Sequence, residues 1–388
     1  MTSAFHPPKP FTLRITDDAL ADLGVRLGLT RFPDQPDLPA WTTGTDLAWM
    51  RELVAYWHKQ FDWRAQEARL NAFDNYTVDI GAHTLHFLHV AGRGPAPLPL
   101  VLSHGWPGSV FEFLQLIPRL TDPARFGGDP ADAFTIVAPS LPGYGLSFKA
   151  GAPRVPIEGM ADLFATLMTD VLGYARFGAQ GGDWGASVSA RLGHAYPDRV
   201  AGIHLNMLPL PRDPHAFDAP SAEERAYLDA VQTWLKQETG YSTIQGTRPQ
   251  TLAYALTDSP AGLAAWIAEK FRAWSDCGGD IDACFSKDEL LSHIGLYWFT
   301  GSINASFWPY YARHQGSWPF PPAGGVTVPT GYAAFPAEIV RPPRSLAART
   351  FTNIQRWTDM PHGGHFAALE QPDALAHEIR AFFRPLRM

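Results

Sequence analysis

The feature that most constrains this fold is an alternation of short apolar runs with helical stretches along the central part of the chain. The runs occupy residues 98–103, 134–138 and 200–205, and they return at residues 326–332 and 354–357. Helical patterns separate them, as over residues 160–172, and a last helix is expected over residues 372–383. Short apolar runs that alternate with helices are typical of βαβ units. We therefore predict an α/β fold with a mostly parallel central sheet.

A second region carries no strand signals and is expected to be helical. Between residues 208 and 318 helical patterns dominate, for example over residues 221–238 and 259–274. A chain of 388 residues exceeds the usual size of one compact domain, which favours a core with an inserted subdomain. We predict a helical cap. The expected division is an N-terminal domain over 1–92, the first part of the core over 93–207, the cap over 208–318 and the second part of the core over 319–388.

The first 92 residues are expected to form two helices and a β-hairpin. Thr16 can cap a helix whose first turn carries Asp17 and Asp18, and these carboxylates favour the positive end of the helix dipole. Apolar residues at steps of three and four predict a second helix with one buried face, formed by Leu47, Met50, Val54, Trp57 and Phe61. Alternating residues on both sides of Gly81 predict a hairpin over residues 76–90.

The composition excludes several classes of partner. With 31 Lys and Arg against 38 Asp and Glu, the net charge of −7 offers no basic field for nucleic acid. No apolar stretch approaches the ~18 residues of a membrane span, so we expect a soluble, cytoplasmic protein with no membrane anchor. Cys277 and Cys284 are too few for a metal site of thiolates and are expected to be free thiols. The aromatic content of 13% suits a large apolar pocket.

Residues 181–186, with the sequence Gly-Gly-Asp-Trp-Gly-Ala, have the form of a nucleophile elbow, the tight strand-to-helix turn of the α/β-hydrolase fold. Strand and helix close up around the nucleophile, so the positions two before and two after it must be small, as Gly181 and Gly185 are. The central residue is Asp183, whose ionised carboxylate can attack an sp3 carbon without a base and form an alkyl ester. The structural alternative is an aspartate that only caps the following helix.

Two further segments agree with this fold. Residues 104–109, with the sequence His-Gly-Trp-Pro-Gly-Ser, follow the first strong core strand, where the fold supplies half of its oxyanion hole. The backbone N–H groups of Trp106 and Trp184 are the expected donors. His365 follows the last strand and is the candidate base, because nucleophile, acid and histidine occur in that order in this fold. His104 is expected to be structural.

A histidine base needs a carboxylate on its second ring nitrogen, to fix the tautomer and stabilise the imidazolium. Glu338 follows the penultimate strand and is the favoured orienting acid. Asp213, after the apolar run at 200–205, is the alternative, since some enzymes of this fold take their acid from that position. Asp359 lies on the strand that leads to His365, too near in sequence to orient it.

Beyond these motifs the chain resembles, over nearly its whole length, the epoxide hydrolases related to the microsomal enzyme of animals. The matching stretches in the N-terminal part and the core are residues 10–14, 61–63, 104–109, 142–145, 181–185 and 204–207. Those in the cap are Gly240, Tyr241, Gln245, Thr247, Pro249, Thr251 and residues 258–260 and 262–265. The resemblance implies an α/β-hydrolase core wrapped by an N-terminal epoxide hydrolase domain, without the membrane anchor that precedes it in the animal enzyme.

The resemblance also implies roles for individual residues. By it, the nucleophile is Asp183, the base His365 and the orienting acid Glu338. Two cap tyrosines that match Tyr241 and Tyr310 complete the family's site. A neutral phenol with a pKa near ~10 can donate a hydrogen bond to the epoxide oxygen and then protonate the developing alkoxide. Tyr311 adjoins Tyr310, and a shift of one residue in the matching would exchange the two.

The expected activity is therefore conversion of a small apolar or aryl epoxide and water to a vicinal diol, without a metal or cofactor. One alternative is a haloalkane dehalogenase, which shares an aspartate nucleophile followed by tryptophan, as in Asp183-Trp184. The cap tyrosines and the N-terminal domain argue against it. The other alternative is a catalytically silent relative that binds ligands, which disagrees with the full set of catalytic groups. So large an apolar surface is compatible with a homodimer.

Overall fold

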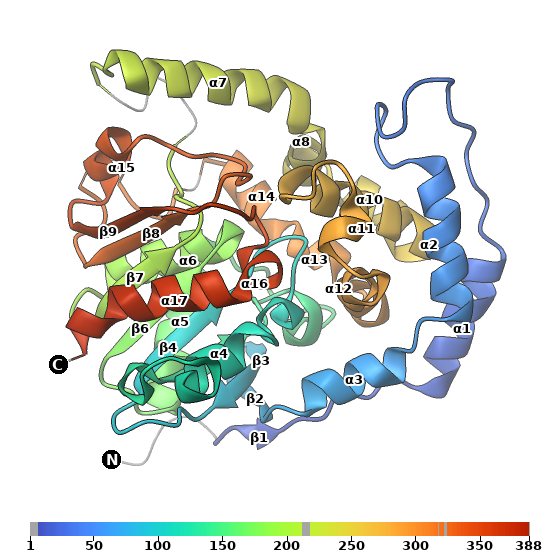
Figure 1. The fold of residues 1–388 in the computed structure, drawn as a ribbon. Helices are drawn as coiled ribbons and strands as arrows, with labels where there is room; N and C mark the ends of the chain where they lie inside the picture. Colours follow the sequence, from blue (N-terminus) through green and yellow to red (C-terminus); the bar gives the residue numbers. More distant parts are fainter. Residues whose placement is uncertain (1–6, 212–217, 317, 322–323, 388) are drawn as a thin grey trace.

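The computed structural model describes residues 7–211, 218–316, 318–321 and 324–387. These residues form one central sheet with helices on both faces (Figure 1), and its strands run in the order β1-β2-β3-β5-β4-β6-β7-β8-β9. The strands are β1 Lys9–Pro10, β2 Asn75–Ile80, β3 His83–Val90, β4 Leu98–Ser103, β5 Phe134–Pro139, β6 Phe177–Gly181, β7 Val200–Leu205, β8 Thr330–Ala334 and β9 Ile354–Asp359. The pairs from β5 through β9 in this order are parallel, and those from β1 to β5 are antiparallel. The predicted α/β fold with a mostly parallel sheet is confirmed.

Helices fall into three groups by position. The N-terminal helices are α1 Asp17–Gly28, α2 Leu47–Lys59 and α3 Trp63–Asn71. Those that cover the sheet are α4 Leu116–Thr121, α5 Ile157–Thr166, α6 Asp183–Ala195, α15 Arg344–Thr350, α16 Ala367–Glu370 and α17 Pro372–Phe383. Those of the cap are α7 Ala222–Glu238, α8 Gly240–Thr247, α9 Pro249–Asp258, α10 Pro260–Trp274, α11 Ile281–Cys284, α12 Lys287–Thr300, α13 Ile303–Ser306 and α14 Trp308–His314. Among all helices described, none is both long and apolar enough to cross a membrane.

The N-terminal segment contacts both the core and the cap. Helices α1 and α2 pack against α10, and α2 also contacts α12 (Figure 1). Tyr56 of α2 donates a hydrogen bond of 2.8 Å to Asp288 of α12. The predicted hairpin is formed by β2 and β3, and β3 pairs with β5, so the hairpin continues the central sheet. This segment therefore connects the sheet of the core to helices α10 and α12 of the cap.

One helix of the N-terminal segment differs from the prediction, and another was not predicted. Helix α2 ends at Lys59, so Phe61, which we placed on its buried face, lies beyond it. The reason is that the side chain of Asp62 caps the next helix, α3, by accepting the N–H of Arg64 at 2.8 Å. Polar residues dominate α3 and hide its periodicity. Its buried Glu67 is compensated by an ion pair of 2.7 Å with Arg64.

The core elements follow the predicted order with small differences. Strands β4 and β7 have the predicted bounds, whereas β8 begins later than expected, and Val326 makes only an isolated bridge to Phe351. The helix expected over 160–172 begins at Ile157 and continues as a π-helical turn over Leu167–Val171. Strand β6 was not predicted as an apolar run because two of its five residues are glycines. A Cβ at Gly178 would lie 2.6 Å from the Phe383 ring, so the glycine lets α17 pack closely on the sheet.

The helices expected over residues 221–238 and 259–274 are confirmed as α7 and α10, and two other helices of the cap lie in close contact. Helix α7 begins after Ser221, which forms a capping box with Glu224. Helices α8 and α14 pack together, and a Cβ at Gly246 would lie 3.3 Å from the carbonyl oxygen of Tyr310. This close approach places Tyr241 of α8 beside Tyr310 of α14, with 5.8 Å between their ring centroids.

Candidate active site

Asp183 occupies the predicted strand-to-helix elbow between β6 and α6. Its φ of +48° lies in the left-handed region, which is costly for a residue with a side chain. A Cβ at Gly181 would lie 2.3 Å from the backbone of Gly185, and a Cβ at Gly185 would lie 1.9 Å from the carbonyl oxygen of Ser103. The two glycines are therefore required for strand and helix to close up, as the sequence predicted.

His365 and Glu338 meet Asp183 at the ends of the parallel strands. The carboxylate Oε1 of Glu338 lies 2.7 Å from His365 Nδ1, and Asp183 Oδ2 lies 3.4 Å from His365 Nε2. The side chain of Glu338 is 0% exposed and that of Asp183 is 16% exposed, so Glu338 is sealed behind the imidazole while Asp183 can be reached. Ala337 donates its backbone N–H to Gly363 at 3.1 Å, which aligns the two loops that carry acid and histidine.

The two carboxylates determine the charge of His365. Burial alone would lower the pKa of its imidazole, but the charges and hydrogen bonds of Glu338 and Asp183 raise that pKa well above its ordinary value. The backbone N–H of His365 donates to the carbonyl oxygen of Trp274 at 2.8 Å. The end of cap helix α10 therefore helps to hold the histidine loop in place.

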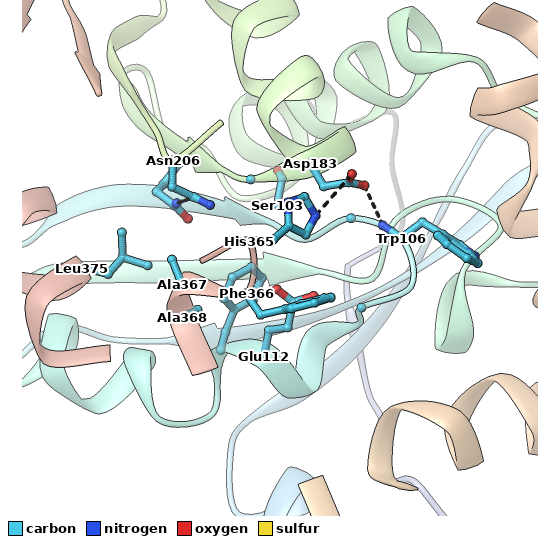
Figure 2. A pocket seen from close by; sticks show the side chains of 15 residues that line it. Ser103, Trp106, Glu112, Asp183, Asn206, His365, Phe366, Ala367, Ala368 and Leu375 are labelled. Carbon is cyan, nitrogen blue, oxygen red and sulfur yellow. Dashed lines mark hydrogen bonds and ion pairs between the residues drawn. The ribbon is translucent and has the colours of Figure 1, made fainter. Parts of the chain in front are cut away.

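The loop after β4 approaches the Asp183 carboxylate through its backbone. Trp106 donates its N–H to Asp183 Oδ1 at 2.8 Å (Figure 2). A Cβ at Gly105 would lie 2.2 Å from the same oxygen, so this loop position has no room for a side chain. One predicted oxyanion donor thus points at Asp183. The second, the N–H of Trp184, belongs to the first turn of α6 and stays a prediction.

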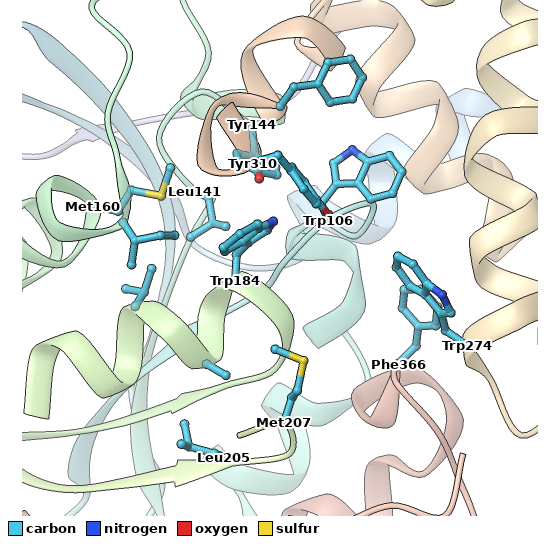
Figure 3. Close-up of a cluster of buried hydrophobic side chains, with 14 of the residues drawn as sticks. Trp106, Leu141, Tyr144, Met160, Trp184, Leu205, Met207, Trp274, Tyr310 and Phe366 are labelled. Atoms are coloured by element: carbon cyan, nitrogen blue, oxygen red, sulfur yellow. The ribbon is translucent and has the colours of Figure 1, made fainter. Parts of the chain in front are cut away.

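The two cap tyrosines line a cavity of about 240 Å³ that opens onto Asp183. Its apolar walls are formed by Trp184, Met207, Leu208, Pro209, Leu210, Leu235, Ile339 and Val340. The Tyr241 ring stacks on Trp106 at 5.4 Å and 10°. The Tyr310 ring meets Trp184 edge-on at 4.9 Å, and both of these side chains are labelled in Figure 3. Burial, together with Tyr241 and Asp183, raises the pKa of Tyr310 well above its ordinary value, so this phenol is protonated at neutral pH.

Of the three residues considered besides the expected site residues, the structure describes two, Tyr311 and Asp359. Tyr311 stacks on Trp308 at 5.0 Å and is not among the residues that line the cavity. Asp359 lies exposed at the end of β9. Asp213 lies outside the described residues. His104, for which we expected a structural role, is buried, and its imidazole accepts a hydrogen bond of 3.1 Å from the backbone N–H of Leu141, in agreement with that role.

A second, smaller cavity is lined in part by Glu112, an acidic residue that the sequence analysis did not select. Its volume is about 20 Å³, and Asp183, His365 and Glu112 are among the residues that line it (Figure 2). Removal from water raises the pKa of Glu112 to about 8; the charge of His365 opposes this rise, and the charge of Asp183 adds to it. The signal in the sequence is the spacing of Ser109 and Glu112, which is that of a capping box. That spacing indicates only local structure and does not reveal that Glu112 lies near Asp183, His365 and Glu338.

The sheet, the glycine-flanked elbow and the histidine after the last strand define a hydrolase of the α/β-hydrolase class. Its elbow carries a carboxylate in place of the usual serine. Two family models match the chain: the epoxide hydrolase N terminus over residues 8–113, and the alpha/beta hydrolase fold over residues 99–243.

Comparisons with individual proteins identify the family within the α/β-hydrolase class to which the chain belongs. A protein of Stigmatella aurantiaca, assigned provisionally as an epoxide hydrolase, is 44% identical over 97% of this chain and 85% of its own length. Epoxide hydrolase 1 of Oryctolagus cuniculus is 35% identical over 96% and 88%. The structure of Aspergillus niger epoxide hydrolase superimposes with a TM-score of 0.85 at 30% identity, covering 99% of this chain and 98% of the other. The chain belongs to the microsomal-type epoxide hydrolase family, whose members are hydrolases acting on ether bonds.

Proposed function

We propose that this enzyme opens epoxides through a covalent ester on Asp183 and then hydrolyses that ester with water activated by His365. The single observation that carries the proposal is the position of the Asp183 carboxylate, which lies at the cavity wall with the two cap phenols on the same cavity and with His365 Nε2 3.4 Å from its Oδ2. Asp183 thus lies between the cavity lined by the two phenols, which can act as acids for the leaving oxygen, and the smaller cavity lined by the base His365.

In the first step Asp183 donates an electron pair to an epoxide carbon, and the carbon–oxygen bond breaks with its electrons moving to oxygen. Tyr241 and Tyr310 donate hydrogen bonds to that oxygen, and one of them transfers its proton. The raised pKa of Tyr310 keeps this phenol protonated throughout the neutral range, so that it can donate a hydrogen bond. The product of this step is an alkyl ester on Asp183, and its alkyl group carries the former epoxide oxygen as a hydroxyl.

Ester formation changes the state of His365. It neutralises Asp183, which is one of the two carboxylates that raise the pKa of His365. The pKa of the imidazole therefore falls, so that His365 can lose its proton and act as the base in the second step. Water then attacks the ester carbonyl, His365 takes the proton, and the N–H of Trp106 stabilises the oxyanion. The imidazolium returns the proton to the departing diol oxygen.

We place the hydrolytic water in the small cavity beside the triad. Its volume of about 20 Å³ exceeds the ~10–15 Å³ that one water requires, and its lining is polar on the side of His365 and Glu112. For the substrate we propose small apolar or aryl epoxides, because the larger cavity has mainly aliphatic and aromatic walls.

Replacement of His365 by glutamine is expected to separate the two steps. Glutamine cannot take the proton of water, whereas alkylation needs no base, so the ester should accumulate on Asp183. Intact-protein mass spectrometry after addition of styrene oxide should show a stoichiometric adduct, with turnover reduced on the order of 10³-fold or more. A His365→Gln variant that turns over normally would mean that another residue is the base.

Replacement of Glu338 by glutamine is expected to produce a weaker defect of the same step with a diagnostic pH dependence. The charge of Glu338 raises the pKa of His365, so its removal lowers that pKa. Hydrolysis requires neutral His365 and is lost as pH falls through this pKa; the acid limb of the hydrolysis rate should therefore move to lower pH. Stopped-flow measurement of ester decay against pH tests this. An unshifted limb together with an inactive Asp213→Asn variant would assign the orienting role to Asp213.

A further inference from the structure

A buried lysine that the mechanism above does not use lies against the ring of Tyr241. The Nζ atom of Lys270, in α10, is 4.6 Å from the centroid of the Tyr241 ring and 5.7 Å from that of Trp274. Distances below about 6 Å are those of cation–π contacts. The side chain of Lys270 is only 7% exposed. The ammonium is therefore held among aromatic rings at the edge of the site.

The burial of this charge calls for an electrostatic explanation. An ammonium is costly to remove from water, and a lysine at the edge of a core usually extends its head group to solvent. Within the described part of the chain, the ion pair of Lys270 is with Glu269 at 2.5 Å, and that side chain is 27% exposed. A methionine has similar length and would fill the same space without burying a charge. Packing alone gives no reason for a cation at this position.

The two phenols differ in their contact with this cation. Among the cation–π contacts of the described residues, Lys270 lies over Tyr241, and no cation lies over Tyr310. Tyr310 instead packs edge-on against Trp184 and Trp106 at 4.9 and 5.8 Å. A cation near a ring stabilises the phenolate more than the neutral phenol, because the phenolate spreads its negative charge into the ring. The ammonium therefore favours proton loss at Tyr241 through a contact that no described cation makes with Tyr310.

We propose that Lys270 is a positioning residue whose charge, acting through the ring of Tyr241, makes Tyr241 the phenol that transfers its proton to the epoxide oxygen, while Tyr310 holds that oxygen by a hydrogen bond. This inference rests on the proposed function. As Asp183 bonds to carbon, the electrons of the broken carbon–oxygen bond move to oxygen, which takes the Tyr241 proton. The resulting phenolate is stabilised by the ammonium until solvent returns a proton.

The test measures ester formation in the His365→Gln background, where the second step is blocked. Rates of adduct formation with styrene oxide are compared for four proteins: this parent, and the same protein carrying Lys270→Met, Tyr241→Phe, or both. We expect Lys270→Met to slow ester formation on the order of tenfold in the presence of the Tyr241 hydroxyl and less than about twofold in its absence. Lys270→Arg, which keeps a cation, should stay within about threefold of the parent.

Controls separate this effect from damage to the fold. Lys236→Met makes the same substitution at an exposed lysine of α7 and should leave the rate unchanged. Lys270→Gln provides a second uncharged variant if Lys270→Met does not fold, and thermal unfolding is measured for each protein. The same loss for Lys270→Met with and without the Tyr241 hydroxyl overturns the inference, as does equal behaviour of the methionine and arginine variants. No adduct in the His365→Gln parent itself would instead contradict the ester mechanism, and so the two failures are distinguishable.

Discussion

Replacing Asp183 by alanine is expected to abolish epoxide opening, with a loss of turnover on the order of 10⁴-fold or more. Alanine has no atom that can bond to the substrate carbon, and the phenols and Trp106 then surround a site without a nucleophile. Diol formation from styrene oxide, followed by chromatography, measures the effect. Asp359→Ala is a matched control, because Asp359 is exposed at the end of β9, and it should retain wild-type activity.

Isotope labelling tests the ester itself. In a single turnover of the wild-type enzyme in heavy-oxygen water, the water oxygen adds to the ester carbonyl and remains in the Asp183 carboxylate. The first diol should therefore be unlabelled, and peptide mass spectrometry should find the label in the peptide that contains Asp183. Label in the diol of the first turnover would show direct attack by water on the epoxide.

Elements with a clear apolar period could be predicted from the sequence, whereas those stabilised by distant partners could not. Strands β4 and β7 and helix α17 have the predicted bounds, because their apolar patterns reflect burial between layers. Helix α3 escaped prediction because the burial of Glu67 depends on its ion pair with Arg64. Strand β6 escaped because the space at Gly178 is filled by Phe383, more than 200 residues away in the chain.

The same distinction applies to the site. Asp183 and His365 lie in short glycine-containing motifs whose backbone geometry requires those neighbours, so local sequence could identify them. The cap tyrosines have no such local signature and were matched only through the resemblance to a family. Glu112 and Lys270 could not be found, since their chemistry depends on burial against segments that are distant in sequence.

The second large effect that we expect is a loss of ester formation when the cap phenols of Tyr241 and Tyr310 are removed. Negative charge develops on the epoxide oxygen as the ring opens, and a buried phenol aimed at that atom contributes on the order of 10²-fold as hydrogen-bond donor and acid. Tyr241→Phe and Tyr310→Phe should each slow ester formation by about this factor. Two donors on one oxygen partly compensate for each other, so the double variant should lose ester formation almost completely. Rapid-quench mass spectrometry of the Asp183 adduct measures these rates.

Tyr311→Phe is the matched control for this pair, because Tyr311 follows Tyr310 directly but stacks on Trp308 instead of lining the cavity. It should change the rate of ester formation by less than about twofold, and hydrolysis of an ester already formed should depend on His365 far more than on either phenol. A double variant that alkylates Asp183 at the wild-type rate would contradict the role of the phenols. In a haloalkane dehalogenase the leaving group is a halide, which needs no proton, so loss of both phenols would leave its ester formation largely intact. Faster release of halide from haloalkanes than opening of any epoxide by the wild-type enzyme, together with that insensitivity, would assign the Asp183-Trp184 elbow to dehalogenation.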